Sequence, residues 1–383
     1  MSRAQSGACL AVLFASLTSA SSVHGQDPWS LHASLITEIA PVALNGHIQL
    51  EHPIGATRLS DGTIVVGDAR RATIAFFDRS GREVQATGRS GGGPGEFRDL
   101  WWIGQCSFDT VFAWDRANAR ITVIGASGRV IREVPPPIPP AQAGRTAFAT
   151  CSASGHTGVV SLPTTMDPRQ PIQRSAAAVT VIDAMGESVQ VGDEIASSEF
   201  VVRGGGGMPR PLGHVTTIAL GTSRVFVGTG DSAAVLSFSL QGGRMGSIRV
   251  PRAEKRVVTS EQYERAIDDL LVLAPSQAVE AIRPMLLELP RPQHTPHYNS
   301  VHVDPSGVLW VVQTVAAERT RLIGVDSIGS TVGIVLLPES LHVYEIGDDY
   351  VLGLRYNSVG EPFIVAYGFR RPVSPSGRPA PEK

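Results

Sequence analysis

Residues 54–87 read IGATRLSDGTIVVGDARRATIAFFDRSGREVQAT, which is four short apolar runs in succession. Tight turns separate the first pair at Ser60-Asp61-Gly62 and the last pair at Arg79-Ser80-Gly81. Alternating apolar residues between Asp-Gly and Ser-Gly turns are typical of β-hairpins. The stretch therefore predicts an antiparallel sheet of four consecutive strands.

The same unit recurs along the chain, each time with a turn glycine at its end. The glycines are Gly81, Gly128, Gly186, Gly242 and Gly329. Seven residues before each lies an apolar residue, namely Ile74, Ile121, Val179, Val235 and Leu322. A repeat of roughly 40–50 residues, read as four short strands, indicates the blades of a β-propeller. The predicted fold class is therefore all-β.

The last repeat lacks a strand. Blades are expected to begin near Ile54 and Leu100, to span 143–196, 213–251 and 296–338, and to end with three strands in 341–369. An open blade edge would leave backbone groups unpaired. Residues 33–44 form a spare strand, so we expect six blades closed by this N-terminal strand. Seven blades, or one irregular blade, is the alternative.

An insertion is predicted between blades four and five. Residues 259–289 carry apolar residues at helical spacing in two runs, and Thr259 and Ser276 are suitable N-caps. The pattern predicts a helical hairpin. It would either pack as a cap on one face of the disc or act as a lid or partner-docking element.

The N-terminus resembles a secretory signal. Arg3 is followed by an apolar run at 8–17 and a small-residue cleavage site ending at Gly25. That run is too short for a transmembrane helix, and no later segment could span a bilayer. We therefore expect a cleaved signal peptide at 1–25, a propeller at 26–371, a disordered Pro-rich tail at 372–383, and a secreted or periplasmic protein.

Composition narrows the choice of partners. The chain of 383 residues has a formal net charge of −2 and contains 18% charged residues. With no basic run, it gives no electrostatic reason to expect nucleic acid as a partner.

Removal of the signal leaves Cys106 and Cys151, which occupy matching parts of neighbouring repeats. An oxidising compartment permits a disulfide between them, and two buried free thiols are the alternative.

The segment Gly88 to Phe97, GRSGGGPGEF, resembles a signature of bacterial six-bladed β-propeller proteins related to NHL repeats. In those proteins the segment joins the outermost strand of one blade to the next blade. No lysine follows the glycines and a strand comes next, so a phosphate-binding loop is not expected. Glu96 is expected to cap backbone amides. The resemblance spans roughly residues 50–370 and implies a fold that hosts unrelated functions.

Histidines begin four of the expected innermost strands. They are His52, His214, His297 and His342. Converging imidazoles could bind a divalent ion of the zinc type. Among NHL-like propellers, the peptidyl-hydroxyglycine amidating lyases resemble this arrangement in using channel histidines for metal. The alternative is that each histidine hydrogen-bonds to its own turn.

Two weaker signals complete the set. Glu51 and Asn299 stand where the resemblance to the gluconolactonase family implies ligands of a divalent cation, but other ligands of that set are missing. Trp101 and Trp102 could form an aromatic ligand platform, although one of them should face the core. No Gly-x-Ser-x-Gly elbow, His-Glu-x-x-His helix or Cys-x-x-Cys pair occurs.

These observations favour an exported binding or interaction module over an enzyme. The ligand site is expected at the channel mouth or on the loop face. A protein, a peptide or a glycan could be the partner. The alternative is a metal-dependent lyase or lactonase that uses the channel-mouth histidines.

Overall fold

The structure is a computed structural model of the chain. It describes residues 30–43, 45–136, 146–161, 166–167, 169–192, 194–203, 206–272, 274, 276–315 and 319–370. The expected signal peptide at 1–25 and the expected tail at 372–383 lie outside the described residues.

Six sheets of four or five strands form the body of the described chain. Sheet 1 contains β3 (Pro53–Arg58), β4 (Ile64–Asp68), β5 (Thr73–Phe77) and β6 (Glu83–Thr87). Sheet 2 contains β7 (Leu100–Ser107), β8 (Thr110–Asp115), β9 (Arg120–Gly125) and β10 (Val130–Val134). Sheet 3 contains β11 (Thr146–Cys151), β12 (Thr157–Ser161), β14 (Ala176–Ile182) and β15 (Ser188–Gln190), with β16 (Ile195–Ala196) also paired to β14.

The remaining three sheets are likewise built mainly from strands that follow one another in the chain. Sheet 4 contains β19 (Thr217–Leu220), β20 (Arg224–Gly228), β21 (Ala234–Ser239) and β22 (Arg244–Arg249). Sheet 5 contains β23 (Ser300–Val303), β24 (Leu309–Val315), β25 (Arg319–Val325), β26 (Thr331–Leu336) and the short β1 (Ser30–Leu31). Sheet 6 contains β27 (His342–Ile346), β28 (Tyr350–Tyr356), β29 (Pro362–Phe369) and β2 (Ala33–Ile39).

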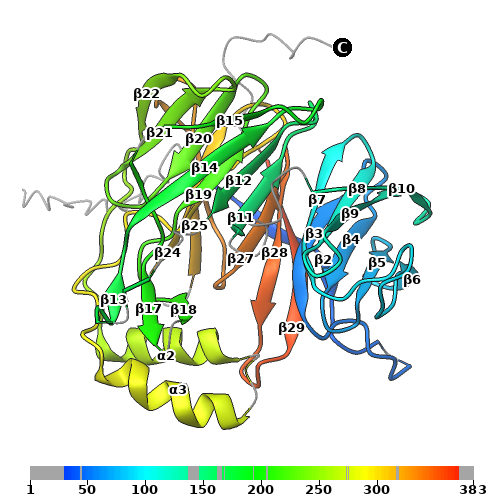
Figure 1. Ribbon diagram of the computed structural model, residues 1–383, viewed down its shortest axis with the longest axis horizontal. Helices are drawn as coiled ribbons and strands as arrows, with labels where there is room; N and C mark the ends of the chain where they lie inside the picture. The colour runs from blue at the N-terminus through cyan, green and yellow to red at the C-terminus, as the bar shows by residue number, and fades with distance from the viewer. Residues whose placement is uncertain are drawn as a thin grey trace, which may run out of the picture.

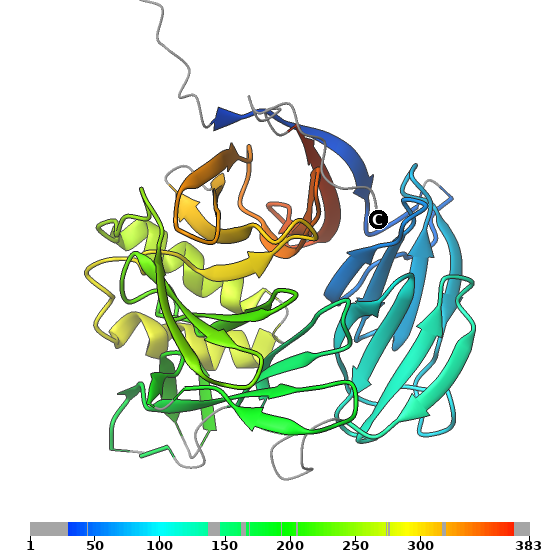
Figure 2. The ribbon, with the colours of Figure 1, turned by 90° about the horizontal axis from the view of Figure 1, so that it is seen from above.

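The sheets stand around a common axis and form a ring (Figure 2). Apolar side chains fill the spaces between neighbouring sheets: one cluster joins Ile74 of sheet 1 to Ile103 of sheet 2, and another joins Phe77 of sheet 1 to Ile364 of sheet 6. Face-to-face packing of antiparallel sheets around an axis is β-propeller architecture. The strands that contact one another around the ring axis are β3, β7, β11, β19, β23 and β27, one from each sheet.

The turn glycines adopt the backbone conformation that the repeat requires. Gly81 has φ 79° and donates its N–H to the carbonyl of Asp78 at 2.9 Å. A Cβ at Gly81 would lie 2.2 Å from the carbonyl oxygen of Glu38, so a side chain would collide with the neighbouring sheet. Gly128, Gly186, Gly242 and Gly329 also have positive φ. The repeated glycine therefore reflects a repeated turn.

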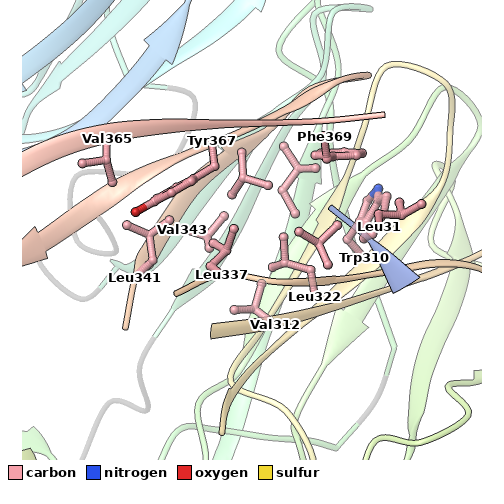
Figure 3. Packing of buried hydrophobic residues seen from close by; sticks show 13 residues of the cluster. Leu31, Trp310, Val312, Leu322, Leu337, Leu341, Val343, Val365, Tyr367 and Phe369 are labelled. Carbon is pink, nitrogen blue, oxygen red and sulfur yellow. The ribbon is translucent and has the colours of Figure 1, made fainter. Parts of the chain in front are cut away.

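The N-terminal segment joins two sheets. The strand expected at 33–44 corresponds to β2, which pairs antiparallel with β29 as the outermost strand of sheet 6. Just before it, β1 pairs in parallel with β26 of sheet 5. Leu31 of β1 lies against Trp310 in the cluster between sheets 5 and 6 (Figure 3). The ring is thus closed by strands from opposite ends of the chain.

A separate unit lies on one face of the ring (Figure 1). It combines the three-stranded sheet of β13 (Ile172–Gln173), β17 (Phe200–Arg203) and β18 (Gly206–Pro209) with helices α2 (Ser260–Leu271) and α3 (Ser276–Glu288). Thr259 and Gln262 form a capping box at the start of α2. We call these elements the cap.

The apolar faces of both helices pack inside the cap. Tyr263, Ile267 and Leu271 of α2 pack with Leu286 of α3 against Val201 of β17. The helices therefore pack on each other and on the cap sheet, and the lid or partner-docking role stays a prediction. At its far end the cap reaches sheet 6, since a Cβ on Gly360 would lie 2.7 Å from Cγ2 of Val272. The cap therefore extends across the face of the ring from sheet 4 to sheet 6.

The GPGEF segment is a structural connection between sheets 1 and 2. Phe97 is fully buried in the cluster that joins them. Glu96 accepts hydrogen bonds from the backbone N–H of Gly93 and from Arg89, both at 2.7 Å, and these bonds lower its pKa. Glu96 therefore caps a loop, as the sequence suggested.

Candidate functional site

Five charged or titratable side chains meet where the cap joins sheet 4. Three belong to the cap side, with Arg174 after β13, Glu199 before β17 and Arg210 after β18. The ring contributes His214, just before β19, and Asp231, just after β20. We call this group the junction cluster. Only His214 was singled out from the sequence.

His214 lies between two carboxylates. Its Nδ1 is 3.4 Å from Oε2 of Glu199, and its Nε2 is 3.6 Å from Oδ1 of Asp231. These distances are long for hydrogen bonds, and both buried ring nitrogens lack a hydrogen-bond partner. Backbone bonds hold the ring in place, because the N–H of His214 donates to Oε2 of Glu199 at 3.0 Å and Glu199 N–H donates back at 2.8 Å.

An arginine balances each carboxylate. Arg210 lies 3.5 Å from Glu199, and Arg174 donates to both oxygens of Asp231, with one bond at 2.9 Å. Arg174 also donates to the carbonyl of Thr229 at 3.2 Å, which ties β13 of the cap to the loop after β20. The cluster therefore serves as the ionic attachment of the cap to the ring.

Both carboxylates titrate below their usual range. Burial raises the pKa of Glu199, but the adjacent His214, through its imidazole and its backbone N–H, and the nearby Arg210 outweigh burial and lower the pKa to about 2. Burial also raises the pKa of Asp231, but the hydrogen bonds from Arg174 outweigh burial, so the pKa is lowered. Both groups are therefore anionic at neutral pH.

The cluster opens into a groove between sheets 3 and 4. The groove has a volume of about 530 Å³, and Asp231 forms part of its wall. Ile195, Leu236 and Phe238 contribute apolar surface to it. Its exposed polar lining residues include Gln190, Glu194 and Arg244. The space exists because the outer edge of sheet 3 is irregular: β15 ends at Gln190 and β16 begins only at Ile195.

A second group of polar side chains lies near the ring axis. His302 of β23 contacts the Ser300 hydroxyl at 3.1 Å, and the ring of His342 on β27 meets that of Tyr344 edge-on at 5.1 Å. Burial, together with the neighbouring His342, lowers the pKa of His302 to about 4. His342 is solvent-exposed, yet the surrounding protein lowers its pKa as well. Both imidazoles are therefore neutral at neutral pH.

His302 was not singled out from the sequence, although a signal exists. It lies between Val301 and Val303, which pack against sheet 4, so strand alternation places its side chain on the other face.

The other predicted histidines have local partners. The backbone N–H of His52 donates to Asp68 at 2.9 Å, and burial lowers the pKa of its half-buried ring. His297 pairs through Nδ1 with the carbonyl of Ala253 at 2.7 Å. Across the described residues, no group of three or more His, Cys, Asp or Glu side chains is placed to hold a metal ion. The metal site of His52, His214, His297 and His342 stays a prediction that this geometry does not support.

The weaker candidates have structural contacts. The backbone N–H of Glu51 donates to Asp68 at 2.7 Å, and Asn299 accepts from the N–H of Thr314 at 2.8 Å. Trp101 packs edge-on against Trp114 at 5.4 Å, and Trp102 packs partly buried in the same cluster. Both tryptophans thus have packing partners, and an aromatic platform stays a prediction.

Cys106 and Cys151 are joined by a disulfide, with their Cα atoms 5.2 Å apart. The bond links the innermost strands β7 and β11 of sheets 2 and 3. In the part of the chain that the structure describes, no helix has the length and apolar character needed to cross a bilayer.

Comparison with known proteins supports the architecture. No protein-family model and no curated protein matches the chain. Among solved structures, a member of the DUF4221 family from Bacteroides vulgatus is 11% identical with a TM-score of 0.50, covering 90% of this chain and 99% of its own. Virginiamycin B lyase from Staphylococcus aureus, solved with quinupristin as a catalytically inactive variant, is 12% identical with a TM-score of 0.43, covering 88% and 99%.

Regucalcin from Agrobacterium tumefaciens, described as a calcium-binding protein, is 9% identical with a TM-score of 0.44, covering 89% of this chain and 98% of its own. The DUF4221 structure, with the TM-score of 0.50, is β-propeller-like. At such identities the likeness concerns the fold alone. The NHL relationship suggested by the GPGEF segment stays a resemblance, and the chain is a β-propeller protein.

Proposed function

We propose that this chain is an exported binding protein whose six larger sheets are the blades of the propeller. Its ligand site is the groove between sheets 3 and 4, beside the junction cluster. One observation carries the proposal: Asp231, which lines this groove, lies beside His214, whose two buried ring nitrogens have no hydrogen bond.

Buried polar groups are normally paired, so an orphaned imidazole between two charged carboxylates requires an explanation. Attachment of the cap alone does not need it, because Arg174 and Arg210 already balance the acids. A ligand in the groove would reach this charged wall through Asp231. Binding sites in rigid folds lie preferentially on loops and at irregular edges, and this groove has both.

The alternative, a metal-dependent lyase or lactonase, is not favoured. It requires His52, His214, His297 and His342 to act together, whereas His52 and His297 bond to separate backbone segments. Elemental mass spectrometry of the mature protein, beside the quadruple alanine variant, tests this alternative. A near-stoichiometric divalent ion that the variant loses would restore it.

Filling the groove tests the binding proposal. We expect polar fragments and short peptides, screened by thermal shift, to include compounds that stabilise the mature protein. Leu236→Trp should abolish their effect, because the indole would occupy the groove. Val84→Trp, an exposed position on β6 of sheet 1, is the matched control and should keep every response. Binding that persists in Leu236→Trp, or no binding at all, would contradict the proposal.

Export is tested separately. Expression of the full chain in a Gram-negative host, with N-terminal sequencing of the periplasmic product, should show cleavage near Gly25. An uncleaved cytoplasmic protein would contradict this part of the proposal.

A further inference from the structure

We infer that the ligand of the groove is a short peptide in which an apolar side chain lies between a cationic and an anionic group. This inference rests on the proposed function and narrows it to one ligand class. The charges, the apolar lining and the backbone around the groove each support it.

The groove presents two opposite charges that are free to interact. Glu194 and Arg244 are both exposed and both line the groove. Among the described residues, no ion pair involves either of them, whereas Asp231 is already matched by Arg174. A ligand with one ammonium and one carboxylate would balance both free charges, and a ligand with a single charge would leave one unmatched.

The apolar lining favours a side chain between those charges. The apolar surface that a ligand can reach is that of Leu236, which is half-buried, whereas Ile195 and Phe238 are only 4% and 2% exposed. Packing an aliphatic side chain against Leu236 removes apolar surface from water, which is favourable. The volume of about 530 Å³ also falls within the range of roughly 300–1,000 Å³ that is usual for small-ligand sites.

The backbone of the same wall favours a peptide over a glycan. On this wall the outer edge of sheet 3 is interrupted, since β15 ends at Gln190 and β16 begins at Ile195. The ring itself shows how an extended segment adds to such an edge: β1 pairs with β26 of sheet 5 and buries Leu31. A glycan would need exposed aromatic surface for stacking, and Phe238, the aromatic residue lining this groove, is buried.

The test is calorimetric titration of the mature protein with the tripeptide Ala-Leu-Ala carrying free termini. The probe for charge is the same tripeptide with an acetylated N-terminus and an amidated C-terminus. We expect the free tripeptide to bind and the blocked one to bind at least about tenfold more weakly, since each charge-assisted contact is worth about one decade of affinity. Arg244→Glu should weaken the free tripeptide by a similar factor.

The matched control is Arg249→Glu, an exposed arginine at the other end of β22 that does not line the groove. It carries the same change in net charge and should leave affinity unchanged. Thermal unfolding of both variants confirms that each remains folded.

Two results would overturn the inference. In one, the blocked and free tripeptides bind equally and Arg244→Glu has no effect. In the other, neither tripeptide binds the wild-type protein. If fragments sensitive to Leu236→Trp still bind in either case, the groove stands as a ligand site and only the peptide class is wrong.

Discussion

Two polar networks join parts of this ring that are far apart in sequence, and they are built differently. The first closes the ring between sheets 6 and 1 around Glu345, which accepts hydrogen bonds from the hydroxyls of Thr57 and Tyr350 and from the backbone N–H of Arg58. The guanidinium of Arg58 also covers the Tyr350 ring at 4.6 Å. We call this network the closing seam. The second is the junction cluster around His214.

The closing seam satisfies its central carboxylate, whereas the junction cluster leaves its central imidazole without hydrogen bonds, next to Asp231 in the wall of an open groove. Fully satisfied networks fix a structure, because loss of any member orphans the others. In the junction cluster the two carboxylates are paired, and it is the imidazole that has no hydrogen bond and is left for a ligand. The difference therefore separates a structural joint from a candidate site.

The two carboxylates also respond to pH with opposite signs. Burial raises the pKa of Glu345, while the pKa of Glu199 is lowered to about 2. The contribution of Glu345 is therefore fully present below its unfolded pKa and falls as pH rises. The contribution of Glu199 is present above its unfolded pKa and falls as pH decreases.

The largest loss in the free energy of unfolding is expected for the disulfide between Cys106 and Cys151, and the losses at the two polar networks can be compared with it. Replacing Cys106 and Cys151 by serine opens a loop with a sequence separation of 45 residues. The chain-entropy relation gives a loss of about 4 kcal/mol in the free energy of unfolding. Urea denaturation of the double variant measures it. An unchanged midpoint, together with free thiols in the wild-type protein, would contradict the disulfide.

The next largest effect is expected at the closing seam. Glu345→Ala removes one acceptor and leaves three donors without their partner, so it should cost about 3 kcal/mol. Glu345→Gln keeps an acceptor of the same shape and should cost about 1 kcal/mol. Both are measured by urea denaturation. Equal losses for Glu345→Ala and for a substitution at His214 would remove the distinction between the two networks.

The dependence of stability on pH in the acid range tests the charge of Glu199 in the junction cluster. The difference between the ordinary glutamate pKa of 4.5 and the folded pKa of about 2 corresponds to about 3 kcal/mol in the free energy of unfolding. This amount should be lost as pH falls from 4.5 towards 2, because the unfolded chain binds the proton first. The measurement is the wild-type protein against Glu199→Gln across that range. Parallel stability curves for the two proteins would refute the assignment.

The smallest effect on stability is expected for His214→Asn. Its ring nitrogens make no hydrogen bonds, and each carboxylate keeps its arginine, so the loss should be about 1 kcal/mol. Ligand affinity at the groove should fall in the same variant, as calorimetry would show. A loss as large as that of Glu345→Ala would make the cluster a structural joint.

Much of the architecture could be predicted from the sequence, for local reasons. The turn at Gly81, the alternation along β4 and β5 and the capping box at Thr259 each depend on residues within a few positions of one another. The spare strand at 33–44 followed from the hydrogen-bonding demand of an unfinished sheet.

The site depended on contacts that no local pattern encodes. His214 could be noted from its place before a strand, but its partners Glu199 and Asp231 come from the cap and from another loop. Arg174 and Asp231 are 57 residues apart, and Glu345 and Thr57 are 288 apart. The sequence alone determined a repeated, turn-rich sheet protein, because hairpins form from neighbouring residues. Ring closure decided which charged side chains meet and which are left beside a groove, because it brings distant strands and loops together in space.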